Sequence, residues 1–154
     1  MTRDQEFLRS LRLAPHPEGG HYREIWRSPA PPGVRAASTL IYYLLEAGQH
    51  SRWHRVDADE IWTWLEGAPL ELWTWTEGQD PERHLLGRLD APGIEPVCVV
   101  PAGCWQAARP VDGFVLSACA VAPGFDFRGF SLLADRPKAA ERLRRRSPGS
   151  ALLI

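Results

Sequence analysis

A histidine and a glutamate, His54 and Glu60, stand between two glycines, Gly48 and Gly67, in the stretch GQHSRWHRVDADEIWTWLEG. Side chains alternate between the two faces of a β-strand, so each of the two residues has a defined side of its own strand. If the turn between the strands forms a hairpin, the imidazole and the carboxylate can face each other. Such a couple in an aromatic interior provides either two ligands of a metal ion or an acid–base pair.

A third interpretation is that the couple only stabilises the fold, because a buried charge needs a partner whether or not it reacts. The spacing of the stretch and its aromatic surroundings favour a ligand site over a structural pair. The chain has seven tryptophans, of which five lie close to this couple in sequence: Trp53, Trp62, Trp64, Trp73 and Trp75. Aromatic strands that line a hollow interior would explain this concentration.

The composition indicates a single globular domain over residues 1–154, with its core at roughly residues 15–135. Of its 154 residues, 44% are hydrophobic and 24% are charged, and the net charge is -1. This charge gives no general attraction for nucleic acid, and no apolar run is long enough to span a membrane. With three cysteines and no signal peptide, we expect a cytoplasmic protein without a disulfide framework.

Short β-branched and aromatic runs, separated by glycine, proline and aspartate, predict an all-β core, either a sandwich or a barrel. Helices are expected only at the ends, over residues 3–12 and 136–146. The alternation in PGFDFRGF, residues 123–130, predicts a final strand with Asp126 facing solvent. The nine main strands are expected within residues 21–28, 35–46, 51–57, 59–67, 70–78, 83–89, 95–103, 104–110 and 113–123.

The segment HPEGGHYRE at residues 16–24 groups polar side chains around Gly19 and Gly20. Glycine allows positive φ angles, so we expect a turn that leads into a strand over the mouth of the barrel. Arg23 in this segment can bind a carboxylate or phosphate through a bidentate contact, or form an ordinary ion pair with Glu24.

The spacing of His54, Val56 and Glu60 between the two glycines resembles the first cupin motif, G(x)5HxH(x)3-4E(x)6G, with valine in place of one histidine. PAGCWQ, residues 101–106, is similar to part of the second motif and has Gln106 at its histidine position. HPEGGHYREIWRS, LIYYLL and VAPGFDFRGFSL resemble further signatures of the cupin-5 group, domain-of-unknown-function family 985. The resemblance covers roughly residues 5–135.

This resemblance implies a double-stranded β-helix, the cupin jelly-roll barrel, that forms a homodimer and has a pocket like those of dTDP-4-keto-sugar epimerases. In metal-binding cupins the matching positions hold three histidines and a glutamate. Here only His54, Glu60 and the amide of Gln106 remain as candidate ligands. We therefore expect no cofactor, with a weakly held divalent metal on these three residues as the alternative.

The resemblance also brings Tyr22 and Arg23 to the pocket. Trp62 and Trp64 share the face of Glu60 by alternation and can stack on a sugar or nucleobase, whereas Trp105 points away and is expected to pack. Cupin epimerases use a tyrosine as the acid, but no tyrosine lies on the corresponding strand. The candidate ligand-binding residues are Tyr22, Arg23, Tyr42, Trp62, Trp64, Gln106 and Cys119.

Three functions follow from these residues. The first is a metal-independent isomerase or epimerase acting on a sugar-like or other oxygenated metabolite, with His54 as base and Glu60 as the carboxylate that orients it. The second is a small-molecule-binding or sensing module without chemistry. The third is a cupin enzyme that depends weakly on a metal.

Overall fold

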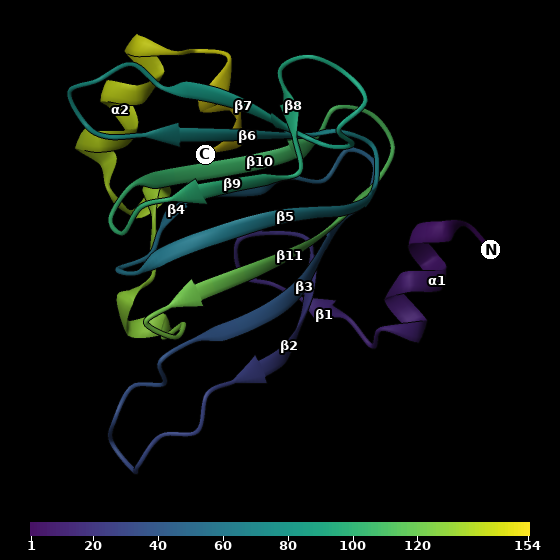
Figure 1. Cartoon of the computed structure of the whole chain (residues 1–154). Helices are drawn as coiled ribbons and strands as arrows, with labels where there is room; N and C mark the ends of the chain where they lie inside the picture. The colour runs from purple at the N-terminus through teal and green to yellow at the C-terminus, as the bar shows by residue number, and fades with distance from the viewer.

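The computed structural model describes residues 1–154 and contains two six-stranded β-sheets that pack face to face (Figure 1). Almost all neighbouring strands are antiparallel, and only β7 and β8 pair in parallel. The first sheet has the order β1 (Ala14–Pro15), β2 (His21–Arg27), β3 (Thr39–Leu45), β11 (Val115–Ala122), β5 (Asp59–Gly67) and β9 (Val97–Val100). The second has the order β12 (Ser131–Leu132), β4 (Ser51–Arg55), β10 (Trp105–Pro110), β6 (Leu70–Trp75), β7 (Glu82–Leu86) and β8 (Ile94–Glu95).

All nine main strands that the sequence predicts are present. The sequence gives no signal for β1, β8 and β12, because each has only two residues and so shows no alternation. The predicted final strand at residues 123–130 is wrong. Asp126 instead accepts a hydrogen bond from the backbone N–H of Arg128 and caps the short 3-10 helix η1 (Phe127–Gly129), which precedes β12.

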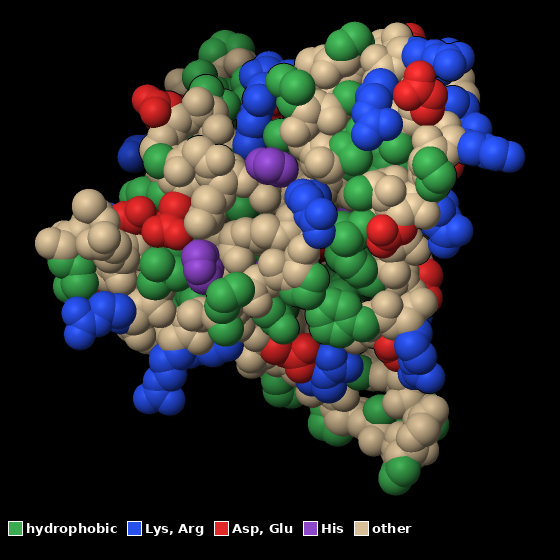
Figure 2. Space-filling model, turned by 180° about the vertical axis from the view of Figure 1, so that it is seen from behind, with side chains coloured by type: hydrophobic (Ala, Val, Ile, Leu, Met, Phe, Trp, Pro, Cys, Tyr) green, Lys and Arg blue, Asp and Glu red, His purple; other side chains and the backbone are tan.

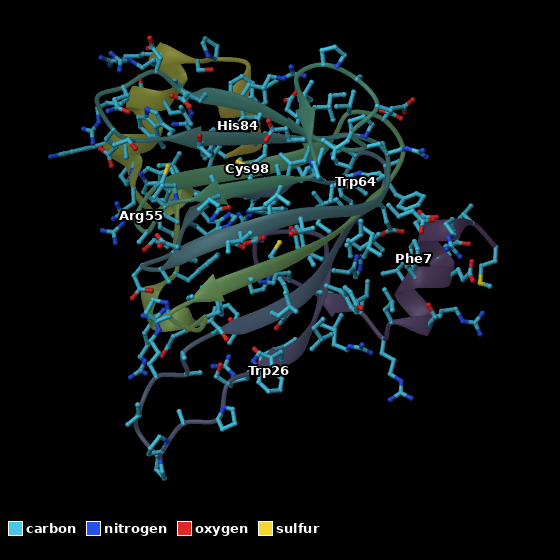
Figure 3. The ribbon with its side chains drawn as sticks, viewed as in Figure 1. Phe7, Trp26, Arg55, Trp64, His84 and Cys98 are labelled. Carbon is cyan, nitrogen blue, oxygen red and sulfur yellow. The ribbon has the colours of Figure 1, made fainter.

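The two predicted helices are confirmed as α1 (Arg3–Ser10) and α2 (Pro137–Arg146). Helix α1 lies at one end of the sandwich, where Phe7 contacts Phe114 edge to face (Figure 3). Helix α2 and the 3-10 helices η2 (Leu133–Asp135) and η3 (Ser150–Leu153) cover the outer face of the second sheet. Neither α-helix has the length and the apolar character that crossing a membrane requires.

The apolar side chains form two separate clusters. One lies between the sheets and includes Tyr43 and Trp62 from the first sheet and Leu72 from the second. The other lies between the second sheet and α2 and includes Trp105 from the sheet and Leu143 from the helix. Trp105 therefore has the packing role expected from its alternation.

The outer face of the first sheet carries an apolar row that crosses five strands in register. Directly opposed residues on neighbouring strands point to the same face, so the row is continuous. Trp26, at the margin of this face on β2, is 53% exposed (Figure 3). The members of the apolar row are Trp26, Leu40, Ala120, Ile61 and Val99. Figure 2 shows charged side chains of both signs scattered over the face seen from behind, in keeping with the net charge of -1.

Strands β4 and β5 do not form the hairpin on which the predicted His54–Glu60 couple depended. β4 pairs with β10 and β12, and β5 pairs with β11 and β9. The turn at residues 56–58 therefore carries the chain from the second sheet to the first. His54 and Glu60 reach the interior from opposite sheets.

Candidate active site

A cavity of about 340 Å³ opens between the two sheets, within the range of small-molecule sites in proteins. Its wall combines strand residues with two irregular segments, at residues 16–18 and 125–127. The residues that line it are His16, Glu18, Tyr22, Glu24, Arg27, Thr39, Ile41, His54, Val56, Glu60, Val121, Phe125, Asp126 and Phe127.

His54, on β4, is 1% exposed, and both of its ring nitrogens have close partners. Its Nδ1 lies 2.7 Å from the carbonyl oxygen of Arg52, and its Nε2 lies 3.0 Å from Oε2 of Glu18. A carbonyl and a carboxylate only accept, so both ring nitrogens carry hydrogen and the ring is an imidazolium. Burial acts to lower the pKa of His54, but the Glu18 carboxylate outweighs it and raises the pKa to about 9.

Glu18 is the carboxylate partner of His54, and sequence reasoning did not find it. Its side chain is buried, and its own backbone carbonyl accepts from Arg52 N–H at 2.7 Å. Burial acts to raise the pKa of Glu18, whereas the charge of His54 lowers it, and the net direction is downward. Glu18 and His54 therefore form a buried ion pair.

The turn after Glu18 brings two parts of the backbone very close together. Gly19 has a φ of 110°, and a Cβ placed on it would lie 2.2 Å from the carbonyl oxygen of His50. The hydroxyl of Tyr43 donates to the carbonyl of Gly19 at 2.5 Å. Only glycine leaves room for the backbone to come this close to His50, and this close contact holds Glu18 against the second sheet.

Glu60, on β5, is 7% exposed and has one free oxygen. Its Oε2 accepts from Nε2 of Gln106 at 2.7 Å, and Oε1 of Gln106 accepts from Nε1 of Trp62 at the same distance. Oε1 of Glu60 has no hydrogen-bond partner and is not fully enclosed, and the side chain lines the cavity. Burial, with the nearby charge of Glu18, raises the pKa of Glu60 to about 7, although His54 opposes this.

His16 contributes a neutral imidazole to the same cavity. Its Nδ1 accepts from the backbone N–H of Glu18 at 3.1 Å, so the hydrogen of the neutral ring is on Nε2. Burial lowers the pKa of His16 despite the neighbouring Glu18. The ring of Tyr22 stands edge-on to it at 4.5 Å between centroids. The Nε2–H group has no partner within the protein and is available to a ligand.

Of the predicted ligand-binding residues, Tyr22 lines the cavity, but Arg23 and Tyr42 do not. These two are opposed on β2 and β3 and lie on the outer face, with the Arg23 guanidinium 5.9 Å from the Tyr42 ring centroid. A bulge between Glu24 and Trp26 reverses the alternation of β2. Consequently Arg27 is the arginine at the cavity, an outcome that alternation alone cannot predict.

Trp62, Trp64 and Cys119 belong to the core between the sheets, away from the cavity wall. Trp64 donates its indole N–H to the carbonyl of Ala68. Burial raises the pKa of the Cys119 thiol well above its usual value, so this thiol is not activated. Gln106 is fully buried, lies opposite His54 on the neighbouring strand and donates to Glu60, but it does not line the cavity.

The residues present do not fit a cupin metal centre. No group of three or more histidine, cysteine, aspartate or glutamate side chains is arranged to hold a metal ion. Among the predicted ligands, Nε2 of His54 contacts Glu18 and the oxygen of Gln106 accepts from Trp62. Only Glu60 retains an uncommitted donor atom.

The sequence profile described as Cupin superfamily (DUF985), or Cupin_5, matches residues 5–133. Protein SO0799 from Shewanella oneidensis is similar at 33% identity and a TM-score of 0.86, over 100% of this chain and 96% of that one. A hypothetical protein from Leishmania major is 29% identical with a TM-score of 0.80, over 97% and 95% of the two chains.

Oxalate decarboxylase from Bacillus subtilis shares the fold, with a TM-score of 0.63 at 14% identity over 85% of this chain and 33% of that one. No curated protein matches the sequence. The profile covers most of the chain, and the paired sheets are those of a jelly-roll barrel. The chain belongs to the cupin superfamily, in the cupin-5 group.

Proposed function

We propose that the protein is a metal-independent enzyme that transfers a proton on a small oxygenated metabolite, as an isomerase or epimerase does. The observation that carries this proposal is the free oxygen of Glu60 in the cavity. A carboxyl group with a pKa of about 7 exchanges protons readily at neutral pH. Glu60 therefore takes the role of base in place of His54, whose two nitrogens already donate.

In this mechanism Glu60 removes a proton from the carbon next to a carbonyl group, and the substrate becomes an enolate. The Nε2–H group of His16 and the hydroxyl of Tyr22 donate to the enolate oxygen, as neutral donors do in other proton-transfer enzymes. His54 stays protonated and holds Glu18 in place. Return of a proton to the opposite face of the same carbon completes an epimerisation, and its return to a neighbouring carbon completes an isomerisation.

Exchange of substrate hydrogen with D₂O tests the proposal even when the product is unidentified. Hydroxy ketones and keto sugars would be incubated with the protein and followed by NMR. The Glu60→Gln variant should lose exchange by about 10²-fold or more, whereas Glu66→Gln, an exposed carboxylate on the same strand, should retain it. Exchange at the wild-type rate in folded Glu60→Gln protein would refute the role of Glu60.

A non-catalytic ligand-binding module is the second candidate, and the full engagement of His54 and Gln106 favours it. Such groups fix the shape of a pocket without taking part in a reaction. A compound that raises the melting temperature but neither exchanges hydrogen nor is converted would support this function over the first.

We further propose that the protein acts as a cytoplasmic homodimer. The three free cysteines suit a reducing compartment. The apolar row on the first sheet is an uncovered surface on which a second copy can pack, whereas α2 already covers the second sheet. A flat sheet face of this kind complements itself about a two-fold axis.

A further inference from the structure

The two positively charged side chains at the cavity, Arg27 and His54, already have negatively charged partners in direct contact. The guanidinium of Arg27 donates to both oxygens of Glu24, each at 2.8 Å, and also to the carbonyl of Phe125. His54 is paired with Glu18 at 3.0 Å. Neither positive group is free to attract an anionic ligand.

The remaining carboxylates that line the cavity are Asp126 and Glu60. Asp126 pairs with Arg128 at 2.6 Å, so it too has a cation in contact. Glu60 has only the neutral amide of Gln106 as a hydrogen-bond partner. Ionised Glu60 is thus the one carboxylate of the wall without a cation in direct contact, and it gives the cavity a preference for positive ligands.

Aromatic rings form another part of the cavity wall. The rings of Phe125 and Phe127 stand at 87° with centroids 4.8 Å apart, and both residues line the cavity together with Tyr22. Rings at right angles enclose a group from adjacent sides, and the negative face of an aromatic ring attracts cations. Aromatic walls with a nearby carboxylate suit an organic ammonium ion. They do not form a cluster of metal ligands.

We propose that the cavity binds a metabolite with a quaternary ammonium group, which packs against Phe125 and Phe127 and has Glu60 as its counter-charge. This inference rests on the proposed function, because it places the ligand in the same cavity. It adds the chemical class of the substrate. A quaternary nitrogen has no hydrogen to donate, so it leaves the free oxygen of Glu60 available as a base. The positive charge also acidifies a neighbouring C–H bond, which suits a carboxylate base.

The test compares three probes of nearly equal shape that differ in charge. Choline is cationic, 3,3-dimethyl-1-butanol is neutral and 3,3-dimethylbutanoate is anionic. Binding would be measured by calorimetry at pH 8, where Glu60 is mostly ionised. Choline should bind about tenfold more tightly than the neutral alcohol, and the anion more weakly than either. Equal binding of the three, tighter binding of the anion or no binding of choline would overturn the proposal.

Variants separate the contributions of charge and ring. Glu60→Gln and Phe127→Leu should each reduce the tenfold preference for choline over the alcohol by about threefold, because the charge and the ring each supply part of it. Asp90→Asn removes an exposed carboxylate outside the cavity and should change nothing. If Glu60→Gln does not fold, an unchanged preference in Phe127→Leu overturns the proposal, since Phe127 is 53% exposed and tolerates replacement. These probes need not react, so the outcome is separate from that of the exchange assay.

Discussion

The pKa values of Glu60 and His54 are both shifted by burial and by the charge of the same neighbour, Glu18. Its negative charge helps to keep Glu60 protonated and favours the charged form of His54. Two buried groups with pKa values shifted away from the ordinary ones are a frequent mark of a functional site. Gln106, at the motif position of a metal-binding histidine, instead connects Glu60 to Trp62 through its amide.

The pH dependence of hydrogen exchange should follow the ionisation of Glu60 and His54. Exchange should rise with pH as Glu60 loses its proton near pH 7, and fall as the His54–Glu18 pair loses its proton near pH 9. Initial rates between pH 5 and 10 would measure both limbs. A rate that increases steadily through pH 9 would contradict a requirement for protonated His54.

Two contributions to the free energy of unfolding, those of His54 and Glu60, should fall as the pH rises. The pKa of His54 is raised from 6.5 to about 9, so its stabilising contribution is complete below pH 6.5 and is lost through pH 9. Glu60, raised from 4.5 to about 7, binds more protons in the native state, so its ionisation reduces stability between those values. Denaturant unfolding at several pH values should show both losses. Glu60→Gln should abolish the loss between pH 4.5 and 7, and an unchanged slope there would contradict the assignment.

The turn at Gly19 is the element that delivers Glu18, and a substitution there should act on both the fold and the site. Gly19→Ala forces the new Cβ into the carbonyl of His50, so we expect a loss of more than about 2 kcal/mol in the free energy of unfolding. The pKa of His54 should fall as Glu18 moves away, which histidine NMR signals would report.

Gly78→Ala is the matched control for this substitution. Gly78 also has a positive φ, 94°, but a Cβ added to it would meet no atom within 4 Å. Backbone strain alone should therefore cost about 1 kcal/mol and leave the pKa of His54 unchanged. Equal effects of the two substitutions would mean that the close approach at Gly19 does not position Glu18.

Side-chain alternation and the positions of glycine and proline predicted the regular strands and helices. They missed the segments that have no regular period. The main strands and both helices follow their periods, and the likeness to cupin motifs identified the fold. Arg23 lies outside because it alternates with Tyr22, which faces the cavity. The later bulge in β2 turns Arg27 inward, and no residue type in HYREIWR signals that bulge. Glu18 lies in an irregular turn where alternation has no meaning, although an acid between proline and two glycines was a visible hint.

For the whole molecule, the apolar row makes a prediction about association. Ile61 is 41% exposed and lies between Ala120 and Val99 in the row, and a lysine there should disrupt packing of a second copy. Light scattering should give the mass of a dimer for the wild type and of a monomer for Ile61→Lys. Leu89→Lys alters an exposed leucine outside the row and should remain dimeric. A monomeric wild type would contradict the proposed homodimer.

The crossover between β4 and β5 has a mechanical consequence. The chain places His54 on one sheet and Glu60 on the other, and Gln106 from β10 connects the sheets by hydrogen bonds to Glu60 and Trp62. The acidity of Glu60 therefore depends on how far apart the two layers stand. A ligand that draws the layers together would change the pKa of Glu60, the proposed base. A core substitution remote from the cavity would change the same pKa without touching Glu60.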